Sequence, residues 1–162
     1  MKKIPLGTTD ITLSRMGLGT WAIGGGPAWN GDLDQQICID TILEAHRCGI
    51  NLIDTAPGYN FGNSEVIVGQ ALKKLPREQV VVETKCGIVW ERKGSLFNKV
   101  GDRQLYKNLS PESIREEVEA SLQRLGIDYI DIYMTHWQSV PPFFTPIAET
   151  VAVLNELKAE GK

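Results

Sequence analysis

The sequence predicts an α/β fold of the (β/α) barrel type, in which parallel strands alternate with helices. Three observations support this prediction. Patterns typical of buried strands and of amphipathic helices alternate four times along the 162 residues. The glycines of "GLGTWAIGGGPAWNG" lack the Gly-x-Gly-x-x-Gly order that opens a helix in dinucleotide-binding folds. Each predicted strand is also followed by a polar or aromatic residue, as at the mouth of a barrel.

The chain is expected to begin with a hairpin and a first strand–helix unit. Residues 2–15 predict two short strands around the turn "GTTD", and "RMGLGTW" (15–21) predicts the first buried strand. Residues 34–48 have helical spacing, with Asp32 as a candidate cap and Gly49 as the stop. The apolar face of this helix carries Ile37, Cys38, Ile42, Ala45 and Cys48.

The next two units follow the same pattern. "INLID" (50–54) predicts the second strand, after which Asn63 is expected to cap a helix over 64–75. That helix carries, at helical spacing, Val68, Leu72 and Leu75. "QVVVETK" (79–85) predicts the third strand, and its three successive valines indicate burial on both faces.

A long polar segment precedes the fourth unit. Residues 86–109, rich in Lys, Arg, Gly and Asn, are expected to form a functional or mobile loop. A helix is then predicted from its cap at Ser110 to Gly126, with Pro111 in the first turn. Its apolar stripe consists of Ile114, Val118, Leu122 and Leu125. "YIDIYMTH" (129–136) predicts the fourth strand. One face of the last helix carries Ile147, Val151 and Leu154.

Composition restricts the class of protein. A net charge of −3 does not favour a nucleic-acid partner, and no apolar run approaches the ~18 residues of a membrane span. The N-terminus lacks the apolar stretch of a signal peptide, so a cytoplasmic protein is expected. Cys38, Cys48 and Cys86 are expected to pack in the interior, as free cysteines commonly do. His46 and His136 have no ligand partners at useful spacing, so no metal site is expected.

Polar and aromatic residues gather at the carboxyl ends of the four predicted strands. They are Thr20 and Trp21, Asp54, Lys85, and His136 and Trp137. Each type has an ordinary explanation when taken alone, because aspartates form turns, lysines are usually solvated and histidines often pack. Parallel barrel strands, however, point their carboxyl ends at one shared mouth, where catalytic groups collect. The common position therefore predicts a functional site.

The chemistry of these residue types favours proton donation to a carbonyl oxygen. Tyr59 follows Asp54 closely, and a phenol with a pKa of about 10 donates a proton poorly at neutral pH. An ammonium such as Lys85 favours the phenolate, and a carboxylate such as Asp54 holds the lysine in place. A histidine opposite the phenol can hydrogen-bond the substrate oxygen. Such a site suits the reduction of a carbonyl once a cofactor delivers a hydride.

Four segments resemble the aldo-keto reductase family, in the family's order: "GLGTW", "NLIDTAPGYNFGNSEVIVGQAL", "VVETK" and "LGIDYIDIYMTHW". The resemblance covers the whole chain and implies a catalytic tetrad, which consists of Asp54, Tyr59, Lys85 and His136. It implies that Tyr59 donates the proton and that Lys85 and Asp54 tune it, while His136 orients the carbonyl. It also implies NADH or NADPH as the hydride donor. The residues expected along the nicotinamide end of the cofactor are Thr20, Trp21 and Asp54.

A complete barrel of this family has eight strand–helix units, whereas the sequence predicts four. The chain is therefore expected to be a single truncated domain, residues 1–162, that corresponds to the N-terminal half of the barrel. Most cofactor contacts of the family belong to the other half, which leaves the choice between NADH and NADPH open. Four parallel strands leave unpaired edges, so a homo-oligomer joined through the exposed half-barrel edges is expected.

The same resemblance implies small aldehydes and ketones as substrates, including methylglyoxal-like α-oxoaldehydes. The expected substrate contacts are Trp21, Tyr59, His136 and Trp137. The aromatic walls suggested for the pocket are Trp21, Trp90, Trp137 and Phe143.

Two other functions stay open at this point. Because the cofactor half is not part of the pattern, the chain could be a non-catalytic or regulatory half barrel, similar to the β subunits of potassium channels. Alternatively, Lys85 with a neighbouring tyrosine could form an imine, as in a Schiff-base lyase or aldolase.

Overall fold

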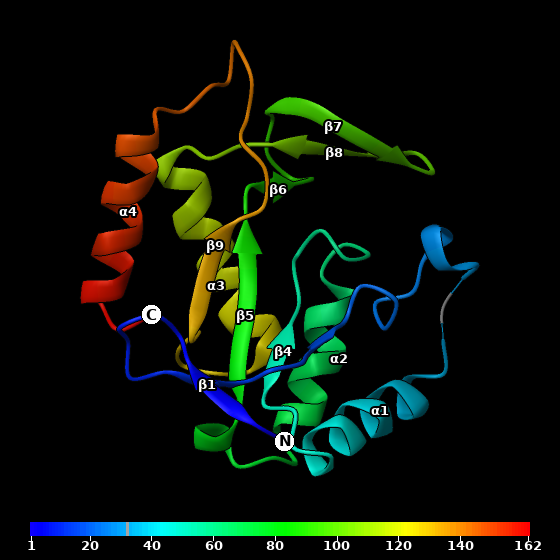
Figure 1. The fold of residues 1–162 in the computed structure, drawn as a ribbon. Coiled ribbons are helices and arrows are strands. Elements are labelled where there is room, and N and C mark those ends of the chain that lie inside the picture. Colours follow the sequence, from blue (N-terminus) through cyan, green and yellow to red (C-terminus); the bar gives the residue numbers. More distant parts are fainter. Residues whose placement is uncertain (32) are drawn as a thin grey trace.

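A four-stranded parallel sheet forms the centre of the computed structural model, which describes residues 1–31 and 33–162. Its strands, in spatial order, are β3 (Gly17–Gly19), β4 (Leu52–Asp54), β5 (Val81–Cys86) and β9 (Ile132–Thr135). Their order in the sheet follows their order in the chain, as in the first four strands of a barrel. The described sheet stays open, so the fold is half of a (β/α)8 barrel, as the sequence predicted (Figure 1).

The four α-helices of the described chain cover one face of this sheet, and each contacts the next along the sequence (Figure 1). They are α1 (Gln35–Arg47), α2 (Asn63–Leu72), α3 (Pro111–Leu125) and α4 (Ile147–Ala159). The hydrophobic core lies between sheet and helices, where Ile42, Val82 and Ile114 are completely buried. Side chains alternate along a strand, so the two neighbours of a core-facing strand residue such as Val82 point to the open face of the sheet.

The predicted N-terminal hairpin is present and lies at the amino ends of the parallel strands (Figure 1). It consists of β1 (Lys3–Pro5) and β2 (Thr12–Ser14), which pair antiparallel. The Ser14 N–H donates to Asn51 Oδ1 (2.6 Å), and the Asn51 N–H donates to Ser14 Oγ (3.0 Å). These bonds tie the hairpin to the start of β4, at the end of the sheet that is remote from the predicted site.

The helix boundaries predicted for α3 are confirmed. Ser110 Oγ accepts from the Ser113 N–H, Pro111 occupies the first turn, and Gly126 ends the helix with a left-handed φ of 65°. Of the predicted apolar face of α4, only Leu154 packs against the core, since Ile147 is 70% and Val151 48% exposed. The buried residues of α4 are Thr150, Val153 and Leu157. None of the described helices is long and apolar enough to cross a membrane.

Two details of α1 differ from the sequence prediction. Asp34 caps the helix by accepting from the Ile37 N–H (3.0 Å), while the predicted cap, Asp32, lies outside the described residues. Ile37 and Cys48 were expected on the apolar face but are exposed. The buried stripe instead includes Ile39, because the helix turns a neighbouring set of positions toward the sheet.

The start of α2 also differs from the prediction. Gly62 is the N-cap, and Asn63 is the first helical residue rather than the cap. The Asn63 side chain donates instead to the carbonyl of Gly24 (2.9 Å), and so holds the loop after β3. The helix ends at Leu72, before the predicted end at Leu75.

Residues 86–109 are folded, so the prediction of a long loop was wrong. They contain an antiparallel sheet of β6 (Ile88–Val89), β7 (Ser95–Val100) and β8 (Arg103–Lys107), with Gly101 left-handed in the turn. The β7–β8 hairpin lies beyond the carboxyl end of β5 (Figure 1). Most of its side chains are exposed, so the sequence lacks the apolar alternation that marks a half-buried strand.

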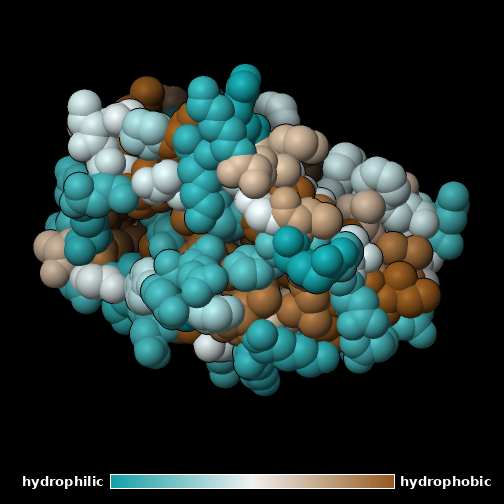
Figure 2. Space-filling model, turned by 60° about the horizontal axis from the view of Figure 1, so that its bottom comes forward, coloured by the Kyte–Doolittle hydropathy of each residue, from teal (hydrophilic) through white to brown (hydrophobic). Residues whose placement is uncertain are grey.

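We expect the 162-residue chain to form homodimers or larger assemblies. β3 and β9 are the edge strands of the described parallel sheet, and the unpaired backbone groups of an edge can pair with another strand. Figure 2 also shows hydrophobic surface between hydrophilic patches on one face of the molecule. Light scattering should therefore give at least twice the 18.0 kDa mass of one chain, and a clean monomer contradicts the expectation.

Candidate active site

Strand register brings three predicted residues to the open face of the sheet. Asp54 pairs with Glu83 across β4 and β5, and Lys85 pairs with Met134 across β5 and β9. Because side chains alternate, Lys85 faces the same side as Glu83 and Asp54, and His136 faces the same side as Met134. From β4 to β5 to β9, the polar residue thus lies one alternation step closer to the carboxyl edge on each successive strand.

Lys85 lies at the centre of the site and is 9% exposed. Its Nζ forms an ion pair with Asp54 Oδ1 and donates to the Thr55 carbonyl (2.9 Å) and to Tyr59 Oη (3.2 Å). Burial alone favours the neutral amine, but the hydrogen bond and charge of Asp54 outweigh it and raise the pKa of Lys85. The site therefore holds a fixed ammonium next to the phenol.

Tyr59 reaches Lys85 from the loop that follows β4. The Tyr59 N–H donates to the Ala56 carbonyl (3.1 Å), which closes the sharp turn between strand and tyrosine. The phenol ring stacks on Trp21, with ring centroids 6.2 Å apart, and meets the His136 ring edge-on at 5.8 Å. All four residues of the predicted tetrad are thus brought together.

His136 is a neutral imidazole in this site. Burial, followed by the nearby charge of Lys85, lowers the pKa of His136 to about 4, and Asp54 opposes the shift only in part. Its Nδ1 is buried and has no hydrogen-bond partner among the described residues. A neutral imidazole can donate from one nitrogen and accept at the other, so His136 can hydrogen-bond a ligand oxygen. No group of three or more metal-ligating side chains occurs in the described part of the chain.

A cavity of about 680 Å³ opens beside the tetrad. Trp21, Tyr59, His136 and Trp137, the expected substrate contacts, all line it. The β7–β8 hairpin also contributes a wall, in which Phe97 contacts Trp137 with ring centroids 5.8 Å apart. Sequence reasoning missed Phe97 because its segment was taken for a loop; its position opposite a strand-end tryptophan carries no local sequence signal.

Three other expected contacts lie elsewhere. Thr20 is completely buried, and its hydroxyl donates to the Asp54 carbonyl (2.8 Å) and lies 2.7 Å from Ser64 Oγ. Its side chain therefore supports Asp54 from behind and does not face the cavity. Trp90 and Phe143 do not line this cavity either, so their prediction as its walls was wrong. Trp90 lines a second cavity, and Phe143 lies half-exposed in the loop before α4.

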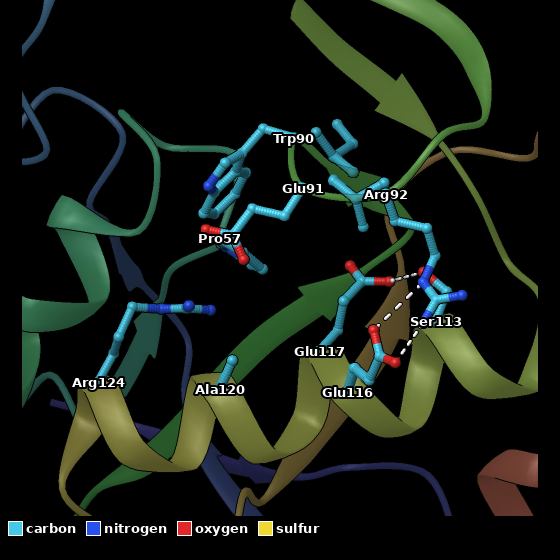
Figure 3. Close-up of a pocket in the computed structure, with 11 residues that line it drawn as sticks. Pro57, Trp90, Glu91, Arg92, Ser113, Glu116, Glu117, Ala120 and Arg124 are labelled. Carbon is cyan, nitrogen blue, oxygen red and sulfur yellow. Dashed lines mark hydrogen bonds and ion pairs between the residues drawn. The ribbon is translucent and has the colours of Figure 1, made fainter. Parts of the chain in front are cut away.

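The second cavity, of about 80 Å³, lies between Trp90 and α3 (Figure 3). Glu117 borders it and accepts hydrogen bonds from the Gly87 N–H (2.8 Å) and from Ser113 Oγ (3.1 Å). Burial raises the pKa of Glu117 to about 7 despite these bonds. Burial also raises the pKa of the neighbouring Cys86 thiol, which makes this cysteine a packing residue rather than a nucleophile.

Comparison with known proteins confirms the family resemblance. The model of the aldo/keto reductase family matches residues 15–162. The chain is 98% identical over 162 residues to the NADH-specific methylglyoxal reductase of Escherichia coli (strain K12), and it covers 50% of that protein. A 45% identical relative is the aldo-keto reductase YhdN of Bacillus subtilis (strain 168), of which the chain covers 45%. The chain thus spans about half the length of the curated relatives it matches.

Solved structures share the same half of a fold. The chain resembles the holo form of the aldo-keto reductase AKR11C1 from Bacillus halodurans, with a TM-score of 0.80 and 35% identity. The matched region covers 99% of this chain and 47% of that one.

The raised pKa of Glu117 predicts a pH dependence of stability. The folded state holds this proton more tightly than the unfolded state, so stability falls as the pH rises from about 4.5 to about 7. The shift corresponds to roughly 3 kcal/mol at most. Urea unfolding at pH 5 and pH 8 should show a smaller pH effect in Glu117→Gln than in the wild type. Glu116→Gln, on the exposed side of α3, is the matched control, and an equal pH effect in both variants contradicts the prediction.

The lowered pKa of His136 predicts its charge state in solution. Nitrogen-15 NMR of the imidazole should show a neutral ring from pH 8 down to about 5, whereas an ordinary histidine is half protonated near pH 6.5. Because the unfolded chain binds this proton more readily, the contribution of His136 to stability is lost as the pH falls from about 6.5 to about 4. Half-protonation near pH 6.5 in the folded chain is the contrary result.

Proposed function

Because the chain belongs to the aldo/keto reductase family, we propose that it forms the proton-donating half of an enzyme that reduces small aldehydes and ketones to alcohols with NADH or NADPH. The observation that supports this most directly is the Lys85 ammonium, which lies between the carboxylate of Asp54 and the hydroxyl of Tyr59. The proposal also treats residues 1–162 as a single domain, a half-barrel unit.

In the proposed reaction, Tyr59 gives its proton to the carbonyl oxygen of the substrate. A reduced nicotinamide, when bound, supplies the hydride to the carbonyl carbon. The negative charge left on the Tyr59 oxygen is stabilised by the Lys85 ammonium at 3.2 Å, and Asp54 keeps that ammonium in position. Neutral His136 hydrogen-bonds the same carbonyl oxygen and fixes its direction.

The residues present fit only the reacting end of such a cofactor. Trp21 is 53% exposed and lines the cavity, and the Asp54 side chain is 31% exposed, so both can contact a nicotinamide ring. The Thr20 side chain is buried and engaged, so we assign it the support of Asp54. The choice between NADH and NADPH therefore depends on contacts outside these residues.

Small α-oxoaldehydes are the substrates that we propose. The E. coli relative is called a methylglyoxal reductase, and the cavity beside Tyr59 has aromatic walls and few charged groups. Such walls suit a compact carbonyl compound that the polar groups of the tetrad then orient.

The two alternatives lead to different expectations. A Schiff-base mechanism requires a neutral Lys85, whereas the raised pKa and the three contacts of its Nζ keep the amine protonated. Borohydride with a carbonyl substrate should therefore trap no adduct at Lys85.

A non-catalytic half barrel is the main alternative. Fluorescence titration of the 162-residue chain with NADH and NADPH tests it, because saturable binding followed by turnover contradicts a non-catalytic role.

Replacing the proton donor should abolish most of the reduction. In a full-length form, where this chain is continued by the second half of the E. coli relative, Tyr59→Phe should lower kcat with methylglyoxal by roughly 100-fold or more. Tyr106→Phe removes a hydroxyl from β8, away from the tetrad, and is the matched control. Circular dichroism checks that both variants fold. Full activity of Tyr59→Phe would contradict the proposal.

A further inference from the structure

The backbone that follows Tyr59 is strained. Asn60 and Phe61 have φ values of 52° and 53°, and Gly62 has 85°, so three successive residues are left-handed. Glycine adopts this conformation freely and asparagine tolerates it, but a bulky residue such as Phe61 rarely does. A strained residue persists only when its surroundings hold it, and such residues cluster at functional sites.

The ring of Phe61 is held on two sides. The Arg103 guanidinium of β8 lies over its face, with Cζ 3.7 Å from the ring centroid. The Trp90 ring meets it edge-on, with centroids 5.6 Å apart and planes at 86°. We call these three residues the Phe61 clamp. In Figure 3 Trp90 lies at the edge of the second cavity, across from Arg124.

The backbone around the clamp leads directly to the proton donor. The Gly62 N–H donates to the Pro57 carbonyl (2.7 Å), and the Ser64 N–H donates to the Tyr59 carbonyl (3.3 Å). A side chain at Gly62 would meet Arg124 Cδ at 2.6 Å, so the loop has no room to shift on that side. Rotation of the Phe61 backbone out of the left-handed region would therefore strain these two hydrogen bonds, one of which is accepted by the Tyr59 carbonyl.

We propose that Phe61 is a positioning residue, and that the Phe61 clamp holds Tyr59 within reach of Lys85. The inference rests on the proposed function, in which the phenol must stay aligned with the ammonium and the substrate oxygen. The same β7–β8 hairpin that supplies Arg103 also places Phe97 against Trp137 in the cavity wall. The hairpin thus joins the substrate wall to the support of the proton donor.

Two measurements test the proposal: hydrogen exchange, which does not depend on catalysis, and the kinetics of the catalysed reaction. Hydrogen exchange of residues 58–64 is measured in the 162-residue chain, and kcat and KM for methylglyoxal are measured in the full-length form described above. Arg103→Gln removes the cation from the clamp, and Lys107→Gln makes the same charge change on the same strand as a matched control. Phe61→Leu removes the ring, and Phe61→Tyr keeps it.

Arg103→Gln should accelerate exchange of residues 58–64 by roughly 2- to 5-fold, the shift expected from an exposed cation–π contact. It should lower kcat by roughly 3- to 10-fold with little change in KM or in cofactor binding, because a misaligned phenol affects mainly the transition state. Phe61→Leu should also accelerate exchange and lower kcat, but Phe61 itself lines the substrate cavity, so the unchanged KM is expected only for Arg103→Gln. Phe61→Tyr and Lys107→Gln should behave like the wild type.

Two results overturn the inference: unchanged exchange in Arg103→Gln, or faster exchange with an unchanged kcat. If Phe61→Leu does not fold, Arg103→Gln decides, since Arg103 is exposed on its strand. An inactive wild-type full-length form would instead refute the proposed function, and the exchange result on the clamp would still stand as a separate observation.

Discussion

The ion pair between Lys85 and Asp54 is the interaction on which the site depends. A charged amine that is largely withdrawn from water needs a partner, and Asp54 supplies it across the two central strands. With its charge fixed there, the ammonium can also bind the Thr55 carbonyl and the Tyr59 hydroxyl. It also helps to keep His136 neutral. The ammonium that Asp54 holds thus contacts Tyr59 and adds to the effect of burial on His136.

A buried polar network on the helical side of the sheet supports this pair. Glu65 of α2 is completely buried and accepts hydrogen bonds from Thr84 Oγ1 and Arg124 Nε, both at 2.6 Å. Beside it, Ser64 Oγ bonds the hydroxyls of Thr20 and Thr55. The first turn of α2 therefore fixes the ends of three strands at once. Removal of one partner from such a network leaves another buried polar group without a hydrogen bond, which is costly.

The sequence was sufficient for the order of the parallel strands and for the placement of Asp54, Lys85 and His136 at one edge of the sheet, because both follow from short-range patterns. Strand alternation and strand ends are local features, and Asp54 and Lys85 could be assigned to one edge without coordinates. The β7–β8 hairpin was not predictable in this way, since its exposed side chains hide its periodicity. The wrong placement of Trp90 has the same origin: its neighbour is Phe61, and that contact depends on the folded hairpin.

The stepped register of the strands also determines which changes of chain length the site can tolerate. Within β5, Lys85 faces the open side only because it follows Val81 by an even offset, four positions. Thr84, at an odd offset, faces the helices. Loss of a single residue between them would exchange the two faces and direct a threonine toward Asp54. An insertion at the tip of the β7–β8 hairpin, near Gly101, would leave this parity intact. The length of the strand is therefore as much a part of the chemistry as the lysine itself.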